Sequence, residues 1–302
     1  MRKYLLLIFF ALFSFSVIHA EIEWTLSDDG TLTISGTDMP DYDMTYEKKQ
    51  YYSTAPWGQL RRKIKNVVIE DGVTCIGVWA FMDCKNLVSV IIPNSVTSIG
   101  EGAFIGCKCL RSVSIPNSVT SIGRETFLDC KSLSSVTIPN TVTSIEFDAF
   151  RNCESLTSVT IPNSVTSIDG SFSGCKSLTS IIIPNLVTSL INGVFFYCKN
   201  LTSVTIPDSV TDMGNQTFQY CKKLTSIVIP ESVTNVGFSA FEDCCNLTSI
   251  TFRGSKPPEF GEDAFKNVKK NISVYVPANS IEAYKKALGN YFPETSIHAL
   301  QH

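Results

Sequence analysis

The chain has 302 residues, with 25 Lys and Arg against 28 Asp and Glu, and a formal net charge of −3. Nucleic-acid binding requires a basic stripe, which this mildly acidic chain lacks, so we expect no nucleic-acid partner. One of its three histidines, His19, stands near the start, and His298 and His302 lie within the last five residues. This placement leaves no base for nucleophilic catalysis and no histidine-based zinc site. The sequence therefore predicts a non-enzyme without a catalytic residue, metal or cofactor.

Residues 1–20 have the pattern of a secretory signal peptide. Arg2 and Lys3 precede an apolar stretch over residues 4–18, and Ala20 is the expected cleavage point. The stretch is shorter than the ~20 apolar residues that span a bilayer, although an uncleaved anchor is the alternative. We expect an exported chain, released or held at the cell surface, with no transmembrane segment after cleavage.

Residues 21–63 differ in pattern from the rest of the chain and form a predicted N-terminal cap. Alternating residues on both sides of Asp29-Gly30 indicate a β-hairpin. A polar and aromatic loop comes after the hairpin. Its aromatic residues are candidates for partner binding, because Tyr and Trp are enriched in binding hot spots. The alternative is that they pack over the first repeat. The residues are Tyr42, Tyr46, Tyr51, Tyr52 and Trp57.

Residues 64–270 repeat on a 23-residue period, which is the signature of a solenoid whose units bury their apolar faces against one another. A Phe recurs with one step of 22, and a Cys follows each Phe three residues later. We expect these residues to be structural. The Phe positions are Phe81, Phe104, Phe127, Phe150, Phe172, Phe195, Phe218 and Phe241. The Cys positions are Cys84, Cys107, Cys130, Cys153, Cys175, Cys198, Cys221 and Cys244.

The unit that begins at Leu110 shows how each coil is built. Alternation of polar and apolar residues predicts a short strand with Val113 pointing inward. Pro116 ends this strand because proline has no N–H for the ladder. A second extended stretch comes next, and Phe127 and Cys130 close the coil. We expect strand-rich coils with at most one helical turn, and a slight kink where the unit beginning at Leu156 is one residue short.

Eleven cysteines in an exported chain ordinarily suggest a disulfide framework. The period indicates instead a column of buried, reduced thiols, because Val268 occupies the same position in the last unit and free Cys also fills a small apolar slot. Disulfides between successive rungs are the alternative. Cys75, Cys109 and Cys245 have no evident mates.

Residues 271–302 form a predicted C-terminal cap and tail. Pro257 and Pro258 replace the second strand of the preceding unit, and residues 271–277 repeat the strand-and-proline pattern once more. Residues 280–288 are then predicted to be a short helix with Ser280 as its N-cap.

The rung Leu-x-Ser-Val-x-Ile-Pro-Asn-Ser-Val-Thr-Ser-Ile-Gly-x-x-Ala-Phe-x-x-Cys, nearly complete in residues 110–130, resembles the BspA-like, or treponemal-type, leucine-rich repeat. The resemblance extends from residue 64 to about residue 277 and includes both flanks. It implies a β-rich solenoid from a bacterial protein that is exported or displayed on the surface. It further implies adhesion to host proteins or to other cells, and it carries no catalytic residue.

The outer face of the predicted strands is a candidate contact surface. Hydroxyl residues point away from the core along it, interrupted by apolar residues such as Ile182 and Val228. The alternative is that small hydroxyl and β-branched residues simply suit a sheet surface. The hydroxyl candidates are Ser112, Ser114, Ser135, Thr137, Ser158, Thr160, Ser203 and Thr205.

A column of lysines is the third candidate surface. Lysines recur one residue after the column Cys, and Glu154 breaks the column. Stacked like charges repel, so we expect a solvated edge that limits aggregation, with attraction of anionic sugars as the alternative. The lysines are Lys85, Lys108, Lys131, Lys176, Lys199 and Lys222.

These features together predict an adhesion module that binds a protein or glycan without covalent chemistry, on host matrix or on another cell surface. A structural spacer or envelope component without a ligand is the first alternative. The second is an enzyme acting on surface polysaccharide, which would need paired carboxylates. Nothing in the pattern fixes an oligomeric state.

Overall fold

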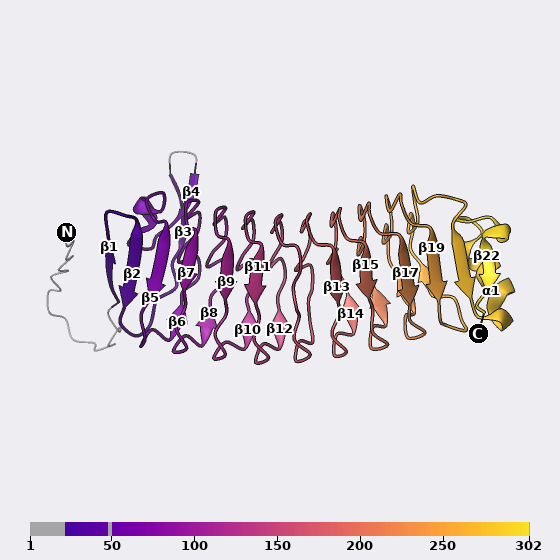
Figure 1. Ribbon diagram of the computed structural model, residues 1–302, viewed down its shortest axis with the longest axis horizontal. Coiled ribbons are helices and arrows are strands. Elements are labelled where there is room, and N and C mark those ends of the chain that lie inside the picture. The colour runs from indigo at the N-terminus through magenta and orange to yellow at the C-terminus, as the bar shows by residue number, and fades with distance from the viewer. Residues whose placement is uncertain (1–21, 48–49, 302) are drawn as a thin grey trace.

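The computed structural model describes residues 22–47 and 50–301, so the predicted signal peptide over residues 1–20 lies outside the described residues. The chain winds into an elongated solenoid, with strand β1 (Glu23–Leu26) at one end and helix α1 (Ile281–Leu288) at the other (Figure 1). The predicted β-rich solenoid is confirmed.

The longer strands lie side by side on one wall, whose outer surface is called here the main strand face. The strands after β1 are β2 (Thr31–Ser35), β5 (Asn66–Ile69), β7 (Ser89–Ile91), β9 (Ser112–Ser114), β11 (Ser135–Thr137), β13 (Ser180–Ile182), β15 (Ser203–Thr205), β17 (Ser226–Ile229), β19 (Ser249–Phe252), β21 (Ser273–Val276) and β22 (Ile297–Ala299). The strands pair within four groups, β1-β2-β5-β7, β9-β11, β13-β15 and β17-β19-β21-β22. From β2 onward the pairs are parallel, in a register that joins equivalent positions, such as Ser112 with Ser135.

A second wall is built from two-residue strands, which pair in parallel and occur once per unit except in the unit beginning at Leu156. Its last member lies directly after Pro257 and Pro258, so the expectation that these prolines replace the strand was wrong; proline is excluded from the ladder but allows a strand to begin after it. The strands are β6 (Cys75–Ile76), β8 (Ser98–Ile99), β10 (Ser121–Ile122), β12 (Ser144–Ile145), β14 (Ser189–Leu190), β16 (Asp212–Met213), β18 (Asn235–Val236) and β20 (Glu259–Phe260).

The unit beginning at Leu110 folds as its alternation predicts. Leu110 and Phe127 are fully buried and Val113 is nearly so, whereas Ser112 and Ser114 are exposed. After Pro116 the chain turns tightly, and the Val119 N–H donates to the Pro116 carbonyl at 3.1 Å. Each unit therefore contributes the same apolar side chains to one continuous core.

The column phenylalanines stack along the axis of the solenoid. Successive ring centroids from Phe81 to Phe265 are 5.1 to 5.6 Å apart, except for 6.2 Å between Phe172 and Phe195. Trp57 extends the stack by one ring, with its centroid 5.6 Å from that of Phe81. The N-terminal cap thus continues the core of the repeats.

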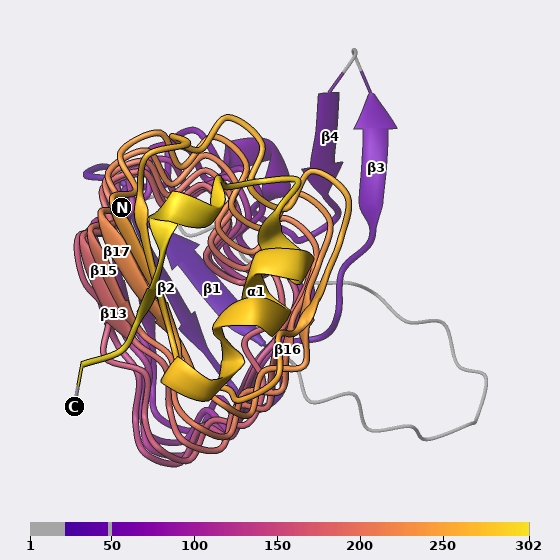
Figure 2. The same cartoon turned by 90° about the vertical axis from the view of Figure 1, so that its right-hand side faces the viewer.

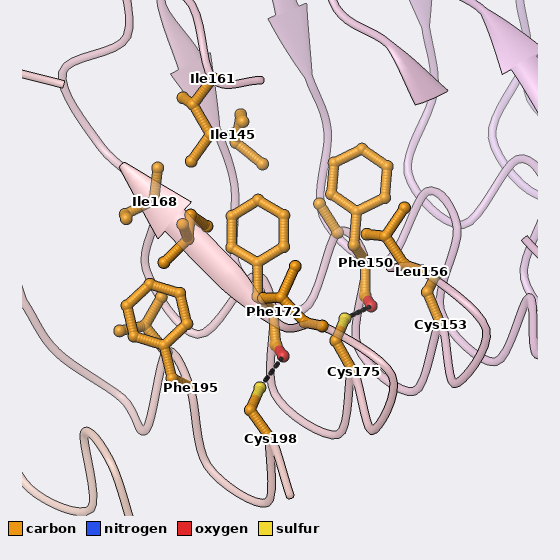
Figure 3. Close-up of a cluster of buried hydrophobic side chains, with 14 of the residues drawn as sticks. Ile145, Phe150, Cys153, Leu156, Ile161, Ile168, Phe172, Cys175, Phe195 and Cys198 are labelled. Carbon is orange, nitrogen blue, oxygen red and sulfur yellow. Dashed lines mark hydrogen bonds between the residues drawn. The ribbon is translucent and has the colours of Figure 1, made fainter. Parts of the chain in front are cut away.

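The column cysteines connect neighbouring units through hydrogen bonds. From Cys107 to Cys244, each thiol donates to the carbonyl of the Phe in the preceding unit at 3.1 to 3.4 Å. Figure 3 shows two of these bonds, from Cys175 to Phe150 and from Cys198 to Phe172. A thiol combines small apolar volume with a weak donor, which explains why this position favours Cys.

All eleven cysteines are free, and the eight of the column are buried, which confirms the predicted thiol column. Burial raises the pKa of the column thiols and brings that of Cys198 to about 12. The three cysteines outside the column differ: Cys109 is exposed, and Cys75 and Cys245 are half-buried.

The short unit that begins at Leu156 disturbs the regularity. Residues 158–160 do not form a strand, and on the second wall only an isolated bridge joins Ser144 to Ser167. The wide 6.2 Å step of the aromatic stack comes directly after this unit. The missing residue is therefore absorbed locally, as expected.

The turns around the column phenylalanines are not helical. Each carries left-handed residues, such as Glu125 at φ 53° and Asp129 at φ 60°. Successive rungs also approach closely at the glycine corners: a Cβ on Gly237 would lie 2.6 Å from the Asn215 nitrogen. Glycine is required there because no side chain fits between the rungs.

The N-terminal segment consists of two hairpins. The predicted hairpin is confirmed: β1 pairs antiparallel with β2, and β2 then pairs in parallel with β5 of the first unit. The region expected to be an aromatic loop is a second hairpin, β3 (Met44–Glu47) and β4 (Gln50–Ser53), followed by the 3-10 helix η1 (Gly58–Leu60).

The C-terminal end contains the predicted strand and helix. The 3-10 helix η2 (Ala278–Ser280) leads into α1, and η3 (Glu294–Ser296) leads into β22. Ser280 does not cap α1 with its side chain, contrary to expectation, because its hydroxyl donates instead to the Ser255 carbonyl at 2.7 Å. Tyr284 of α1 is fully buried and closes the core at this end.

Candidate binding surfaces

The main strand face gathers the hydroxyl residues named from the sequence. All eight are exposed, although Ser158 and Thr160 lie in an extended segment and not in a strand. Ile182 and Val228 lie on the same face with exposed fractions of 71% and 41%. The structure therefore places this candidate set on one wall, and its role in binding stays a prediction.

Side-chain hydroxyls on this face differ from those elsewhere in the repeat. At the turns after the prolines, hydroxyls such as those of Ser118 and Thr141 donate to a Val carbonyl of the preceding unit, except where Leu186 replaces the hydroxyl residue. In the part of the chain that the structure describes, those of Ser114 and Thr137 on the main strand face have no such partner. The face therefore offers free donors and acceptors.

Sequence reasoning missed several exposed apolar residues, Leu186 and Phe238 among them, and one aromatic pair. Leu186 is 53% exposed and replaces the Ser of the Pro-Asn-Ser-Val motif, a departure that could have revealed it. Phe238, at 43%, has no such signal. At the C-terminal end Tyr275 and His298 lie on neighbouring strands with ring centroids 5.8 Å apart.

The aromatic set of the N-terminal segment divides into two groups. Trp57 is fully buried, its indole N–H donates to the Ala80 carbonyl at 2.7 Å, and Tyr42 and Tyr52 are at most 9% exposed. These three residues belong to the core and are not available to a partner, which corrects the sequence-based assignment. Tyr46 and Tyr51 are 58% and 57% exposed, with ring centroids 4.7 Å apart.

The hairpin that carries the exposed tyrosines points away from the main strand face. Seen along the axis in Figure 2, β3 and β4 project at the upper right, whereas β13, β15 and β17 lie at the left. The tyrosines therefore do not extend the strand face. The hairpin is a separate surface with an aromatic side.

The lysine column is in part neutralised. Glu154, which interrupts it, lies 2.9 Å from the amines of both Lys131 and Lys176, and Lys85 lies 3.5 Å from Asp83. The expected like-charge repulsion is thus offset over part of the column. The amine of Lys199 instead lies 4.2 Å from the ring centroid of Tyr197.

The geometry provides little for catalysis. The buried column thiols have raised pKa values and remain protonated at neutral pH, whereas the thiolate is the nucleophile. Across residues 22–47 and 50–301, no three His, Cys, Asp or Glu side chains meet in a way that could hold a metal ion. Over the same residues, no helix has the length and apolar character needed to cross a bilayer.

Solved structures similar to this chain are leucine-rich repeat proteins. One from Bacteroides ovatus is 26% identical, with a TM-score of 0.60 over 95% of this chain and 77% of that chain. One from T. pallidum is 29% identical, with a TM-score of 0.52 over 67% and 87%. A third, from Eubacterium ventriosum, is 23% identical, with a TM-score of 0.52 over 93% and 82%, and shows the fold alone.

None of the curated proteins matches the chain. The model of the BspA type leucine-rich repeat region matches residues 60–171 and 169–291, in six copies. These matches cover most of the chain and coincide with the stacked units described above. The chain therefore belongs to the family of BspA-type leucine-rich repeat proteins.

Proposed function

We propose that this chain is an exported adhesion module that binds a protein or glycan along the main strand face. Membership of the family supports a protein-interaction module. The observation that carries the proposal is the row of exposed hydroxyls, which have no side-chain hydrogen bond within the described residues, whereas hydroxyls at the turns after the prolines are used between rungs. A partner can form hydrogen bonds there without breaking any that hold the fold.

The apolar residues on the same wall supply a second kind of contact. Ile91 and Ile182 are 60% and 71% exposed, so covering them removes apolar surface from water. Polar donors around apolar centres are the usual composition of a binding interface. Regular solenoids provide such extended surfaces because their curvature and length result from repetition.

The proposed location is the cell surface or the extracellular medium. It rests on the signal-like sequence of residues 1–20 and on membership of the BspA-type family, which implies export or surface display. Mass spectrometry of the exported protein would test it. A new N-terminus close to Glu21 is expected, and an intact Met1 on the exported protein would contradict cleavage.

The strand-face proposal is tested with two pairs of substitutions on adjacent units. Ser114→Arg with Thr137→Arg places bulky charge on the face, and Asn117→Arg with Asn140→Arg places the same charge on the exposed loops after the prolines. Each variant is screened against arrays of host matrix proteins and surface glycans. We expect the first pair to weaken binding about tenfold or more and the second to leave it unchanged.

Unfolding of both variants by urea serves as the control for folding. Equal binding by the two folded variants would reject the strand face as the contact surface. Absence of any reproducible ligand for the unmodified chain would favour the structural spacer instead.

A further inference from the structure

The turns that come after the column phenylalanines form a regular edge of the solenoid. The second residue after each Phe is left-handed in every unit, with φ from 57° to 73°. Seven of the nine units have the residues that tolerate this conformation, namely Asp, Asn or Gly. The positions are Asp83, Gly106, Asp129, Asn152, Gly174, Tyr197, Tyr220, Asp243 and Asn267.

Tyrosine occupies this position in two adjacent units. Tyr197 has φ 61° and Tyr220 has φ 63°, a conformation that bulky residues rarely adopt. The other seven units fill this position with Asp, Asn or Gly, so the turn itself does not require a tyrosine. Backbone strain that the turn does not require points to a function for the two rings.

The two tyrosines and a neighbouring phenylalanine form one aromatic group. The rings of Phe196 and Tyr197 each lie 5.7 Å from that of Tyr220, at interplanar angles of 85° and 72°. All three side chains are half-buried. The rings hold one another in place, so little side-chain entropy would be lost when a ligand binds to them.

Lysines lie beside this group, and one of them, Lys176, is paired with Glu154 at 2.9 Å. The amines of Lys199 and Lys176 lie 4.2 and 5.9 Å from the Tyr197 ring centroid. Among the described residues, Lys199 and Lys222 have no carboxylate within ion-pair distance. A hydrogen bond from Lys199, and then the charges of Lys199, Lys176 and Lys222, hold the pKa of Tyr197 below its ordinary value, consistent with positive charge gathered around this ring.

We propose that Phe196, Tyr197 and Tyr220, with Lys176, Lys199 and Lys222, form a binding site for an acidic glycan. We call these six residues the aromatic–lysine patch. A sugar presents apolar C–H faces to aromatic rings, and its carboxylate or sulfate pairs with the amines. The lysines recur once per rung, so a chain lying along the solenoid axis meets them in succession.

An acidic peptide fits this edge less well. An extended peptide needs unpaired backbone groups to bind to. Here the N–H of Tyr197 donates to Gln219 at 2.8 Å and that of Tyr220 donates to Glu242 at 2.9 Å. The backbone donors of both turns are therefore used, either between rungs or within the turn itself. A glycan requires only the side chains, which remain available.

The test measures binding of hyaluronan, which carries carboxylates, and chondroitin sulfate, which also carries sulfates, to the full chain. Dextran is the uncharged control, and poly-glutamate and oligothymidylate are anions without a polysaccharide. We expect the acidic glycans to bind and binding to weaken as salt is raised, because salt screens exposed charges. Dextran should not bind, and the other anions should compete poorly.

Two double variants locate the site. Tyr197→Asn with Tyr220→Asn installs the residue found in this turn at Asn152 and Asn267, so folding is retained while the rings are lost. Lys199→Gln with Lys222→Gln removes two charges. Each should weaken binding about tenfold or more, and the control Lys85→Gln with Lys108→Gln on the same edge should not.

Several results would overturn the proposal. The first is failure of both acidic glycans to bind. The second is a folded tyrosine variant that binds as well as the unmodified chain. The third is competition by poly-glutamate or oligothymidylate that equals that of the glycans. The patch is independent of the strand-face proposal. Ser114→Arg with Thr137→Arg should therefore leave glycan binding unchanged, and the tyrosine variant should leave strand-face binding unchanged.

Discussion

Two units of the solenoid, residues 110–132 and 178–200, have nearly the same interior and different exteriors. At the inward positions the first unit has Leu110, Val119 and Phe127, and the second has Leu178, Val187 and Phe195, all fully buried. The column Cys is also shared. Each inward residue contacts equivalents above and below, so a change in one unit disturbs three.

The outward positions of the same two units diverge. Ser114 corresponds to Ile182, Ser118 to Leu186, Leu128 to Phe196 and Asp129 to Tyr197. The second unit thus contributes to both proposed surfaces, and it comes directly after the short unit. Specificity in such a scaffold is carried by departures from the repeat, because the repeated residues are already used by the fold.

The largest effect is expected when a substitution removes a ring from the shared interior. Phe127→Ala and Phe195→Ala should each lower the free energy of unfolding by about 3–5 kcal/mol, since both leave a cavity in the stack. Urea denaturation measures the two losses. A much smaller loss for Phe195 would show that the second unit is loosely packed and would break the comparison.

The thiol column predicts sensitivity to alkaline pH. Burial raises the folded-state pKa of Cys198 from the ordinary 9.0 to about 12, so the stabilisation is complete below pH 9 and is lost as pH rises towards 12. Between pH 9 and 12, the free energy of unfolding of the unmodified chain should fall by about 1.4 kcal/mol per pH unit more than that of the Cys198→Val variant. Unfolding is followed from pH 7 to 11 in a reducing buffer. Equal slopes for the two proteins would contradict the assignment.

Relief of backbone strain should stabilise the second unit. Tyr197→Asn replaces a bulky left-handed residue and should raise the free energy of unfolding by roughly 1 kcal/mol. The matched change Asp129→Asn in the first unit should have almost no effect, because both residues tolerate the conformation. Destabilisation by Tyr197→Asn would mean that the ring serves the fold.

The smallest effect concerns the loop after the proline. Leu186→Ser restores the hydroxyl that elsewhere donates to a Val carbonyl, as Ser209 does at 2.7 Å. One hydrogen bond of this kind contributes about 1 kcal/mol, and an exposed apolar side chain is removed. Thermal unfolding should shift slightly upwards. A downward shift would indicate that Leu186 packs against its neighbours.

The repeated parts of this fold were predictable because the same sequence pattern recurs in nine units. Val113, Phe127 and Cys130 could be placed inside from periodicity alone, and the hairpin from its Asp-Gly turn. Trp57 was misassigned because it lies outside the repeats, although its position 24 residues before Phe81 is close to the period. Its burial results from stacking on Phe81.

The candidate surfaces were less predictable because they depend on backbone geometry. The sequence does not show that position 197 is left-handed, so a tyrosine there looks ordinary until its φ is known. The direction of the β3–β4 hairpin likewise depends on how the chain leaves strand β2. The strand face was found because alternation along a strand is itself a sequence pattern.

The most direct test of this account replaces the four divergent outward residues named above in residues 178–200 by their counterparts in residues 110–132. The variant carries Ile182→Ser, Leu186→Ser, Phe196→Leu and Tyr197→Asp, and its binding to arrays of matrix proteins and surface glycans is compared with that of the unmodified chain. We predict a folded solenoid whose binding falls by about tenfold or more. A folded variant that binds the same ligands equally well would contradict the claim that outward departures from the repeat carry the function.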